Sequence, residues 1–194
     1  MSNARIKPGG FRDTGPAIWA FARVAGVVTG TNPPHVFTTL GRGRGLFWGW
    51  LHFAGRMMPA GVLPRRESEL VILRVAHLRG SDYEFDHHTR LGRRVGVTDD
   101  DLVAVVAGPT NDHWTGRERS MLAATDELVA TKDLSDDAWS ALIHHLDDRA
   151  ALELLLLVGH YDMLATTLQA LRVEPDRPGR LRRIQQRISS LRSR

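Results

Sequence analysis

The 194-residue chain contains no cysteine. This absence excludes disulfide bonds, thiolate nucleophiles, thiol redox cycles and cysteine-ligated zinc or iron–sulfur clusters. Any chemistry must therefore use histidine, acidic residues, tyrosine, serine or arginine. The remaining composition, 42% hydrophobic and 25% charged, is that of a protein that folds around one core.

The sequence also lacks the features of secretion and of membrane insertion. Residues 1–12 are polar and glycine-rich, with no apolar segment that ends in a cleavage site. No uncharged apolar run reaches the ~18 residues that cross a bilayer. The longest apolar segment, residues 150–171, is interrupted by Glu153, His160 and Asp162. We therefore expect a cytoplasmic protein that makes no membrane contact.

The net positive charge of the chain comes from its C-terminal tail. Residues 177–194 hold seven arginines and no acidic residue, so of the 26 basic and 22 acidic residues, residues 1–176 keep 19 and 22, a net charge of −3. A nucleic-acid surface spread over the fold is therefore not expected. The tail carries an apolar stripe of Leu181, Ile184, Ile188 and Leu191, which predicts a basic amphipathic helix. We expect this helix to dock on protein, with contact to nucleic acid or an anionic membrane as the alternative.

Every long periodic segment has the pattern of a helix, and no run alternates polar and apolar residues between hairpin turns. The sequence predicts an all-α fold with a flexible N-terminus (1–13), one helical domain (14–176) and the C-terminal helix (177–194). The expected helices of the domain are residues 16–28, 35–40, 46–58, 65–79, 81–95, 98–106, 115–130, 135–146 and 150–173.

A helical hairpin at residues 65–95 is expected to form the centre of the domain. Residues 65–79 have almost no polar face, and Gly80 is a typical helix stop. Ser81 and Glu84 have the spacing of a capping box, as do Thr115 and Glu118. In this hairpin we expect the faces of the two helices that carry ionisable residues to meet.

The hairpin predicts contact between a carboxylate and an imidazole. Glu84 and His88 are four residues apart, so they share one face of the second helix. Glu69 lies in the first turn of the first helix, and an antiparallel return brings that end back toward His88. A carboxylate beside an imidazole is a unit for proton transfer.

The spacing of Glu69, Ser81, Glu84 and His88 resembles that of the carboxymuconolactone decarboxylase and alkylhydroperoxidase D-like family. The resemblance covers roughly residues 33–176. The peroxidase branch of this family has cysteines where this chain has Ser81 and Glu84, whereas the decarboxylase branch resembles the sequence Tyr83-Glu84-Phe85 followed by His88. Because a hydroxyl cannot pass through a sulfenate and disulfide cycle, we do not expect thiol-dependent peroxidase activity.

The resemblance implies a helical bundle of the alkylhydroperoxidase D type that assembles into a homo-oligomer, most often a trimer or hexamer. It also implies a decarboxylase-like carbon–carbon lyase that acts on a small organic acid or lactone, with no cofactor and no metal. We expect the N-terminus of the second hairpin helix to bind an anion. The expected catalytic residues are Glu69, His88 and Tyr83, and the expected substrate-binding residues are Ser81, Glu84, Arg74 and His77.

Structural roles for the same residues remain open at this point. A capping box alone accounts for Ser81 and Glu84, and Arg66 could pair with Glu69 for stability only. The aromatic residues of segment 46–58 are expected in the core or in a subunit interface. The competing hypothesis is a non-catalytic ligand-binding or oligomeric interaction protein that kept the scaffold without the thiols.

Overall fold

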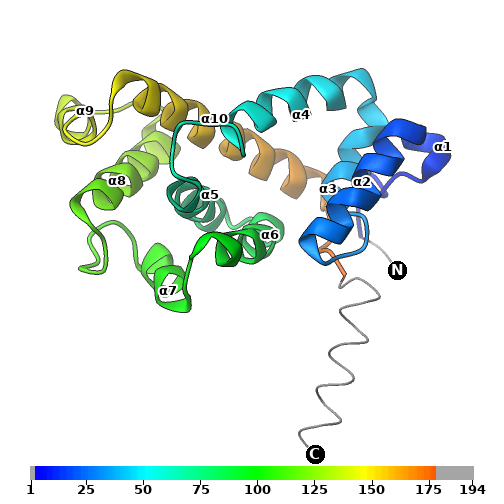
Figure 1. Ribbon diagram of the computed structural model, residues 1–194, viewed down its shortest axis with the longest axis horizontal. Coiled ribbons are helices and arrows are strands. Elements are labelled where there is room, and N and C mark those ends of the chain that lie inside the picture. Colours follow the sequence, from blue (N-terminus) through cyan, green and yellow to red (C-terminus); the bar gives the residue numbers. More distant parts are fainter. Residues whose placement is uncertain (1–2, 178–194) are drawn as a thin grey trace, which may run out of the picture. The chain divides into compact units, whose positions relative to one another are not determined.

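A computed structural model describes residues 3–177 and confirms the all-α prediction, because this part of the chain contains no strand. Two short 3-10 helices, η1 (Gly41–Gly43) and η2 (Arg93–Val95), accompany the α-helices (Figure 1). The α-helices are α1 (Phe11–Thr14), α2 (Pro16–Thr29), α3 (His35–Leu40), α4 (Gly45–Met57), α5 (Arg65–Arg79), α6 (Asp82–Gly92), α7 (Asp99–Ala107), α8 (Gly116–Thr131), α9 (Asp136–Ile143) and α10 (Asp148–Leu171).

Most helix bounds agree with the sequence within a few residues, and those of α5 agree at both ends. The short helix α1 was not predicted, because a single turn after two glycines has no periodic pattern. The segment before it has partners: the Arg5 amide donates to the Leu171 carbonyl at 2.9 Å, and the Gly9 amide to the Thr38 carbonyl at 2.9 Å. The expected helix at 177–194 lies almost wholly outside the described residues.

The chain divides into two compact units. The first unit consists of the residues up to 51 and those from 170 on. Its core is aromatic. Phe21 packs edge to face against Phe37 and Phe47, with ring centroids 5.1 and 5.9 Å apart. Phe47 is buried and Trp48 is exposed. The α4 aromatic residues in this unit are thus divided between core and surface.

Residues 52–169 form the second unit, in which α5 is the central helix. Helices α6, α7 and α8 pack directly on α5 (Figure 1). Burial of α5 is nearly continuous from Ser68 to Ala76, as its apolar sequence predicts. The buried cluster that joins α5 to α7 and α8 comprises Leu70, Leu73, Val97, Ala104, Val105, Trp114 and Leu122.

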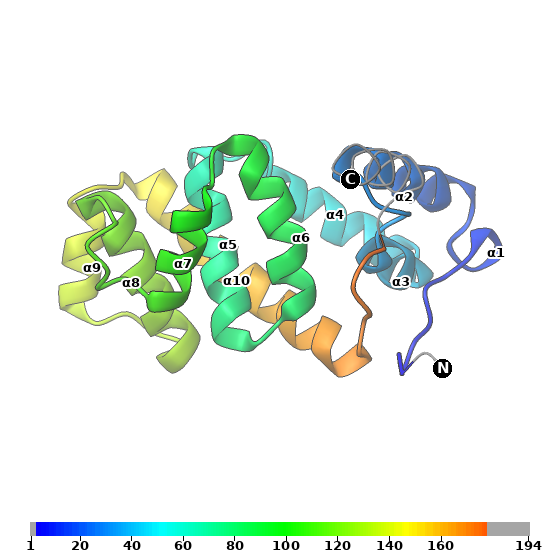
Figure 2. The same ribbon diagram turned by 90° about the horizontal axis from the view of Figure 1, so that it is seen from below.

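Helices α5 and α6 form the predicted antiparallel hairpin (Figure 2). Gly80 ends α5 in the left-handed region at φ 62°, where a side chain would be strained. The Gly80 amide donates to the Ala76 and His77 carbonyls, and the Ser81 amide donates to the Ala76 carbonyl at 2.8 Å. This C-terminal cap fixes the tight turn that returns α6 along α5.

Helix α10 is long and apolar enough to cross a membrane by length and composition alone. Half of its most apolar stretch is nevertheless buried inside the fold, and the core helix of a soluble protein meets the same criteria. This single helix is weak evidence for a membrane span.

Candidate functional site

The hairpin brings Glu69 and His88 into direct contact, deep in the second unit. The Nδ1 atom of His88 lies 2.7 Å from Oε2 of Glu69. Glu69 has no exposed surface and His88 is 5% exposed. With a carboxylate as acceptor, Nδ1 carries the proton and Nε2 keeps its lone pair. The first turn of α5 and the second half of α6 together therefore supply an oriented imidazole.

Arg65 extends this contact into a chain of three ionisable groups. Its Nη2 atom lies 2.7 Å from Oε1 of Glu69, one helical turn along α5. Arg66, which the sequence offered as the partner of Glu69, instead pairs with Asp101 and Glu118. Arg65 is thus a site residue that the sequence analysis missed, although its four-residue spacing from Glu69 is the usual one for a helical ion pair.

Burial sets the protonation of the imidazole. It lowers the pKa of His88, and the charge and hydrogen bond of Glu69 offset only part of this effect. The ring of Tyr161 from α10 meets the His88 ring edge to face at 5.0 Å. Burial, followed by the charges of Glu69 and Glu84, raises the pKa of Tyr161 well above its ordinary value. Near neutral pH the site therefore holds a neutral imidazole and a neutral phenol.

Glu84 and Ser81 lie at the first turn of α6, each 2% exposed. Among the described residues, the two Glu84 carboxyl oxygens and the Ser81 hydroxyl make no hydrogen bond of standard geometry. Burial raises the pKa of Glu84 to about 8, the nearby Ser81 hydroxyl counteracts this in part, and the charge of Asp162 adds to it. Glu84 is therefore a carboxylic acid at neutral pH.

A second buried imidazole, His160 of α10, was also missed as a site residue. Its ring lies 5.1 Å from the Tyr161 ring and 5.5 Å from the ring of Phe53. Burial, with a smaller contribution from His88, lowers the pKa of His160 to about 4. A lone histidine in an apolar helix gives no sequence signal of a site, so only the fold identifies this neighbour of the pair.

The structure does not bring all predicted site residues together. Arg74 makes a two-pronged ion pair with Asp126, at 2.6 and 2.7 Å, and donates to the Val105 carbonyl. These contacts tie α5 to α7 and α8, so Arg74 is a structural residue and its predicted role in substrate binding has no support from its position. His77 is exposed near the C-terminal end of α5, eight residues and ~12 Å along the helix from Glu69.

Tyr83 is buried on α6, but on the face next to that of Glu84 and His88. Its ring stacks on the ring of His87, with centroids 6.0 Å apart and planes 11° from parallel. Successive helical residues are rotated by about 100°, so Tyr83 and His87 share one stripe while Glu84 and His88 share another. The geometry thus places Tyr83 on the stripe of α6 next to the one that carries Glu84 and His88.

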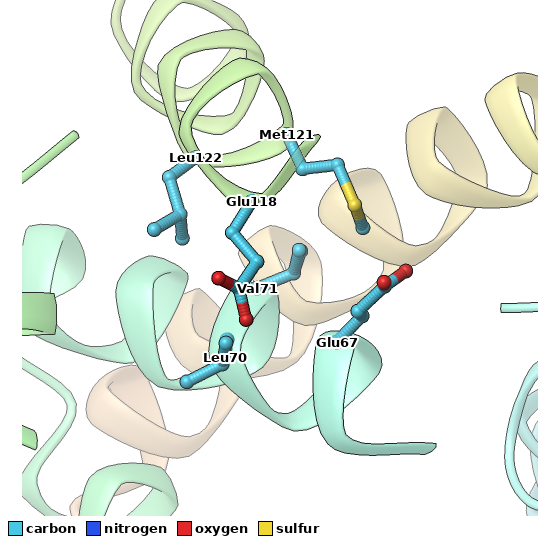
Figure 3. Close-up of a pocket in the computed structure, with 6 residues that line it drawn as sticks. All are labelled: Glu67, Leu70, Val71, Glu118, Met121 and Leu122. Atoms are coloured by element: carbon cyan, nitrogen blue, oxygen red, sulfur yellow. The ribbon is translucent and has the colours of Figure 1, made fainter. Parts of the chain in front are cut away.

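A shallow depression lies elsewhere in this unit, between α5 and α8, and encloses about 150 Å³ including open solvent. Figure 3 shows the carboxylates of Glu67 and Glu118 at its edge. Both are engaged, Glu67 with Arg117 and Glu118 with Arg66. Leu70, Val71, Met121 and Leu122 complete the lining. This depression is a gap between two packed helices joined by ion pairs.

No group of three or more histidine and acidic residues among residues 3–177 could hold a metal ion. The ionisable side chains that the structure gathers in and around the site are Glu69, His88, Glu84, His160 and Tyr161, and such groups can exchange protons. Hydrogen bonds to an anion can come from the first turn of α6.

Part of the chain is similar in sequence to a known protein family. Residues 44–127 match the carboxymuconolactone decarboxylase family. The chain is 24% identical over 97 residues to the uncharacterized protein YdfG of Bacillus subtilis strain 168, a match that covers 49% of this chain and 66% of that protein. The match thus spans just under two thirds of that relative.

Solved structures share the fold at low identity. A peroxidase-related protein from Ralstonia eutropha JMP134, an alkylhydroperoxidase AhpD core, is 17% identical with a TM-score of 0.79, over 90% of this chain and 93% of that one. A variant of the debrominase Bmp8 in complex with 2,3,4-tribromopyrrole is 17% identical with a TM-score of 0.75, over 89% and 91%. Residues 44–127 of this cysteine-free chain are similar to the carboxymuconolactone decarboxylase family, and the fold is that of the alkylhydroperoxidase AhpD core.

Proposed function

We propose that this protein is a decarboxylase-like acid/base enzyme, a carbon–carbon lyase that acts on a small organic acid or lactone without a thiol. One observation carries the proposal: the chain of Arg65, Glu69 and His88, in which Glu69 and His88 are buried, Arg65 is partly exposed, and 2.7 Å separates each pair of partners. Removing charged groups from water costs several kcal/mol per ion unless they are well paired. A fold that only needed stability would be served as well by apolar residues at these positions.

The proposed reaction needs a proton donor and an acceptor for an electron pair. When the carboxylate of a β,γ-unsaturated lactone acid leaves as CO₂, the electron pair of the broken C–C bond moves into the conjugated lactone as a dienolate. A proton then returns to carbon. His88, held by Glu69, delivers this proton after taking it from solvent, so each turnover consumes one proton. Neutral donors such as the Tyr161 hydroxyl suit the developing oxyanion.

The test is turnover by matched histidine variants. Lactone acids of aromatic catabolism are screened against the wild-type protein, with CO₂ release as the readout. His88→Ala and Glu69→Gln should each lower kcat at least a hundredfold, the usual size of an acid/base contribution. His113→Ala is the matched control, because His113 makes an equally short 2.7 Å contact with a carboxylate, that of Asp101, at the start of α7. The control should turn over like the wild type.

Turnover that survives both site variants, in proteins shown to be folded by circular dichroism, would refute the assignment. It would favour the second candidate, a non-catalytic ligand-binding or interaction protein. The near-complete burial of Glu69 and His88 is the observation that favours this candidate. Saturable binding of a lactone acid without CO₂ release would identify it.

A cytoplasmic homo-oligomer, a trimer or hexamer, is part of the proposal. It is supported by an exposed apolar stripe on α10, where Leu152, Leu156 and Met163 are 59%, 44% and 52% exposed. Apolar stripes of this kind commonly mark subunit contacts. Sedimentation of the full chain at micromolar concentration tests this part, and a stable monomer would contradict it. Aspartate in place of Leu156 should lower the oligomeric state.

A further inference from the structure

We propose that the first turn of α6 binds the carboxylate of a small organic acid, with the Ser81 hydroxyl and the Glu84 carboxyl group as its side-chain partners. The inference rests on the proposed function for its ligand class and adds a property to it: binding takes up a proton at alkaline pH. Two buried polar side chains and the open end of a helix carry it.

The first observation is that these side chains do not cap their own helix. In a capping box, the Glu84 carboxyl would accept the Ser81 amide and the Ser81 hydroxyl would accept the Glu84 amide. The Ser81 amide instead donates to the Ala76 carbonyl at 2.8 Å, and α6 has no side-chain cap. The amides of the first turn therefore keep the partial positive charge that favours an anion.

The second observation is independent of the helix end. Glu84 and Ser81 are each 2% exposed, and both Glu84 oxygens and the Ser81 hydroxyl lack a hydrogen bond of standard geometry among the described residues. Buried polar atoms are almost always paired in folded proteins, because an unpaired one destabilises the fold. The two side chains lie close enough to interact with each other, and both keep hydrogen-bonding capacity that a ligand can use.

The surrounding charges decide which partner fits. Asp162 of α10 is the charged neighbour that acts on Glu84, and it is itself paired with Arg79 of α5 and with Lys132. Tyr161 of α10 also lies within electrostatic range of Glu84. His88 lies on the same face of α6, one turn further along, and is neutral.

A neutral carboxyl group, a hydroxyl and helix amides form a set of donors. An oxyanion uses all of them, whereas a cation would use none. A carboxylic acid that donates to a carboxylate makes a short, charge-assisted hydrogen bond. The ligand class that this set fits is therefore a carboxylate, and the proton on Glu84 is a condition of binding.

The proton requirement gives binding a defined pH dependence. With a pKa of about 8, Glu84 is mostly protonated at pH 7 and mostly ionised at pH 9. An ionised Glu84 must take a proton from solvent before it can donate to the ligand. The dissociation constant should therefore rise about tenfold from pH 7 to pH 9, with uptake of nearly one proton per ligand at pH 9.

The experiment is calorimetric titration of the full chain with 2-furoate, a five-membered ring acid, in buffers of different ionisation enthalpy. Methyl 2-furoate, which has no carboxylate, is the neutral control. The wild type should bind 2-furoate at pH 7 without proton uptake and at pH 9 with it. Glu84→Gln keeps a donor and loses the proton, so it should bind equally at both pH values without uptake.

Two further variants keep the outcome decisive. Ser81→Ala should weaken binding severalfold and leave proton uptake unchanged. Glu118→Gln, the same residue type at the same position of a working capping box in α8, should retain the behaviour of the wild type. Absence of binding at pH 7, binding of the methyl ester with equal affinity, or proton uptake that persists in Glu84→Gln would each overturn the proposal.

The two proposals fail separately. If 2-furoate binds with the expected proton uptake but no lactone acid is turned over, the reaction is wrong and the carboxylate site stands. If CO₂ release depends on His88 but 2-furoate binding takes up no proton at pH 9, the reaction stands and the role of Glu84 is wrong.

Discussion

Three helices in the second unit begin with the same sequence pattern, a hydroxyl residue followed three positions later by an acidic one, and only two of them use it as a cap. Thr98 and Asp101 form a reciprocal capping box at α7, with hydrogen bonds of 2.8 and 3.1 Å. Thr115 and Glu118 do the same at α8, at 3.1 and 3.2 Å. Ser81 and Glu84 at α6 do not.

The cause of the difference lies one residue earlier in the chain. The tight turn at Gly80 commits the Ser81 amide to the end of α5, so nothing is left for the Glu84 carboxyl to accept. At α7 and α8 the corresponding amides are free to pair. An identical motif therefore acts as a cap only where the preceding turn leaves its amide available.

The acidic residue of the motif therefore differs in pKa between the two capped helices, α7 and α8, and the uncapped helix α6. Burial acts to raise the pKa of Asp101 and Glu118, but hydrogen bonds from the cap and the charge of Arg66 hold both values below the ordinary range. Within residues 3–177 no cation acts on Glu84 in this way, and burial raises its pKa to about 8. The same motif therefore caps α7 and α8, whereas at α6 it leaves the acidic side chain without a cap partner.

The largest effect that we expect comes from neutralising Glu84. In the unfolded chain its pKa is near 4.5, so between pH 4.5 and pH 8 the unfolded state releases a proton that the folded state keeps, and the fold loses stability as pH rises. Glu84→Gln removes this loss. Its free energy of unfolding should exceed that of the wild type by roughly 2–3 kcal/mol at pH 7 and match it near pH 4.

Urea unfolding at pH 4, 5, 6, 7 and 8 measures this difference. Glu118→Gln is the matched control and should be less stable than the wild type at pH 7, by about 1 kcal/mol. Equal losses in the two variants would mean that Glu84 is an ordinary cap residue.

A smaller effect is expected at Arg66, the cation that joins the two working caps by pairing with Asp101 and Glu118. Arg66→Met should cost about 1–2 kcal/mol at pH 7, because two partly buried carboxylates lose their cation. Both carboxylates have lowered pKa values in the folded state. Their contribution is present above the ordinary values and is lost as pH falls.

The difference in free energy of unfolding between this variant and the wild type should therefore shrink as pH falls below the ordinary pKa values of the two carboxyl groups. A penalty that is the same at pH 7 and pH 3 would show that Arg66 stabilises by packing alone.

The smallest effects are expected at the hydroxyl residues. Thr98→Ala and Thr115→Ala should each lower the free energy of unfolding by about 1 kcal/mol, the usual value of an N-cap. Ser81→Ala, which removes no cap, should change it by less than about 0.5 kcal/mol. A loss at Ser81 as large as that at Thr115 would contradict the comparison between the helices.

The sequence was sufficient for features that depend on local patterns. The bounds of α5 and the turn at Gly80 are set by apolar periodicity and a glycine stop, and they brought Glu69 and His88 together as predicted. The motif alone did not predict that Ser81 and Glu84 form no capping box. The outcome depends on the Ser81 amide, which already donates to the end of α5.

Residues that act over longer distances escaped the sequence analysis for a similar reason. From the sequence, Arg74 is a positively charged residue on a buried helix, as a substrate-binding arginine would be. Only the positions of Asp126 and the α7 carbonyls show that it holds helices together. Tyr161 and His160 reach the site because α10 crosses the hairpin. No spacing within α10 encodes that crossing.

The most direct test of the central claim, that the first turn of α6 is kept for chemistry and not for capping, is the protonation state of Glu84. Infrared difference spectra of wild type against Glu84→Gln should be recorded from pH 6 to pH 10. We predict the carbonyl band of a protonated carboxylic acid at pH 7, which disappears with a midpoint near pH 8. A spectrum without that band at pH 6 and above would show an ionised Glu84 and contradict the account.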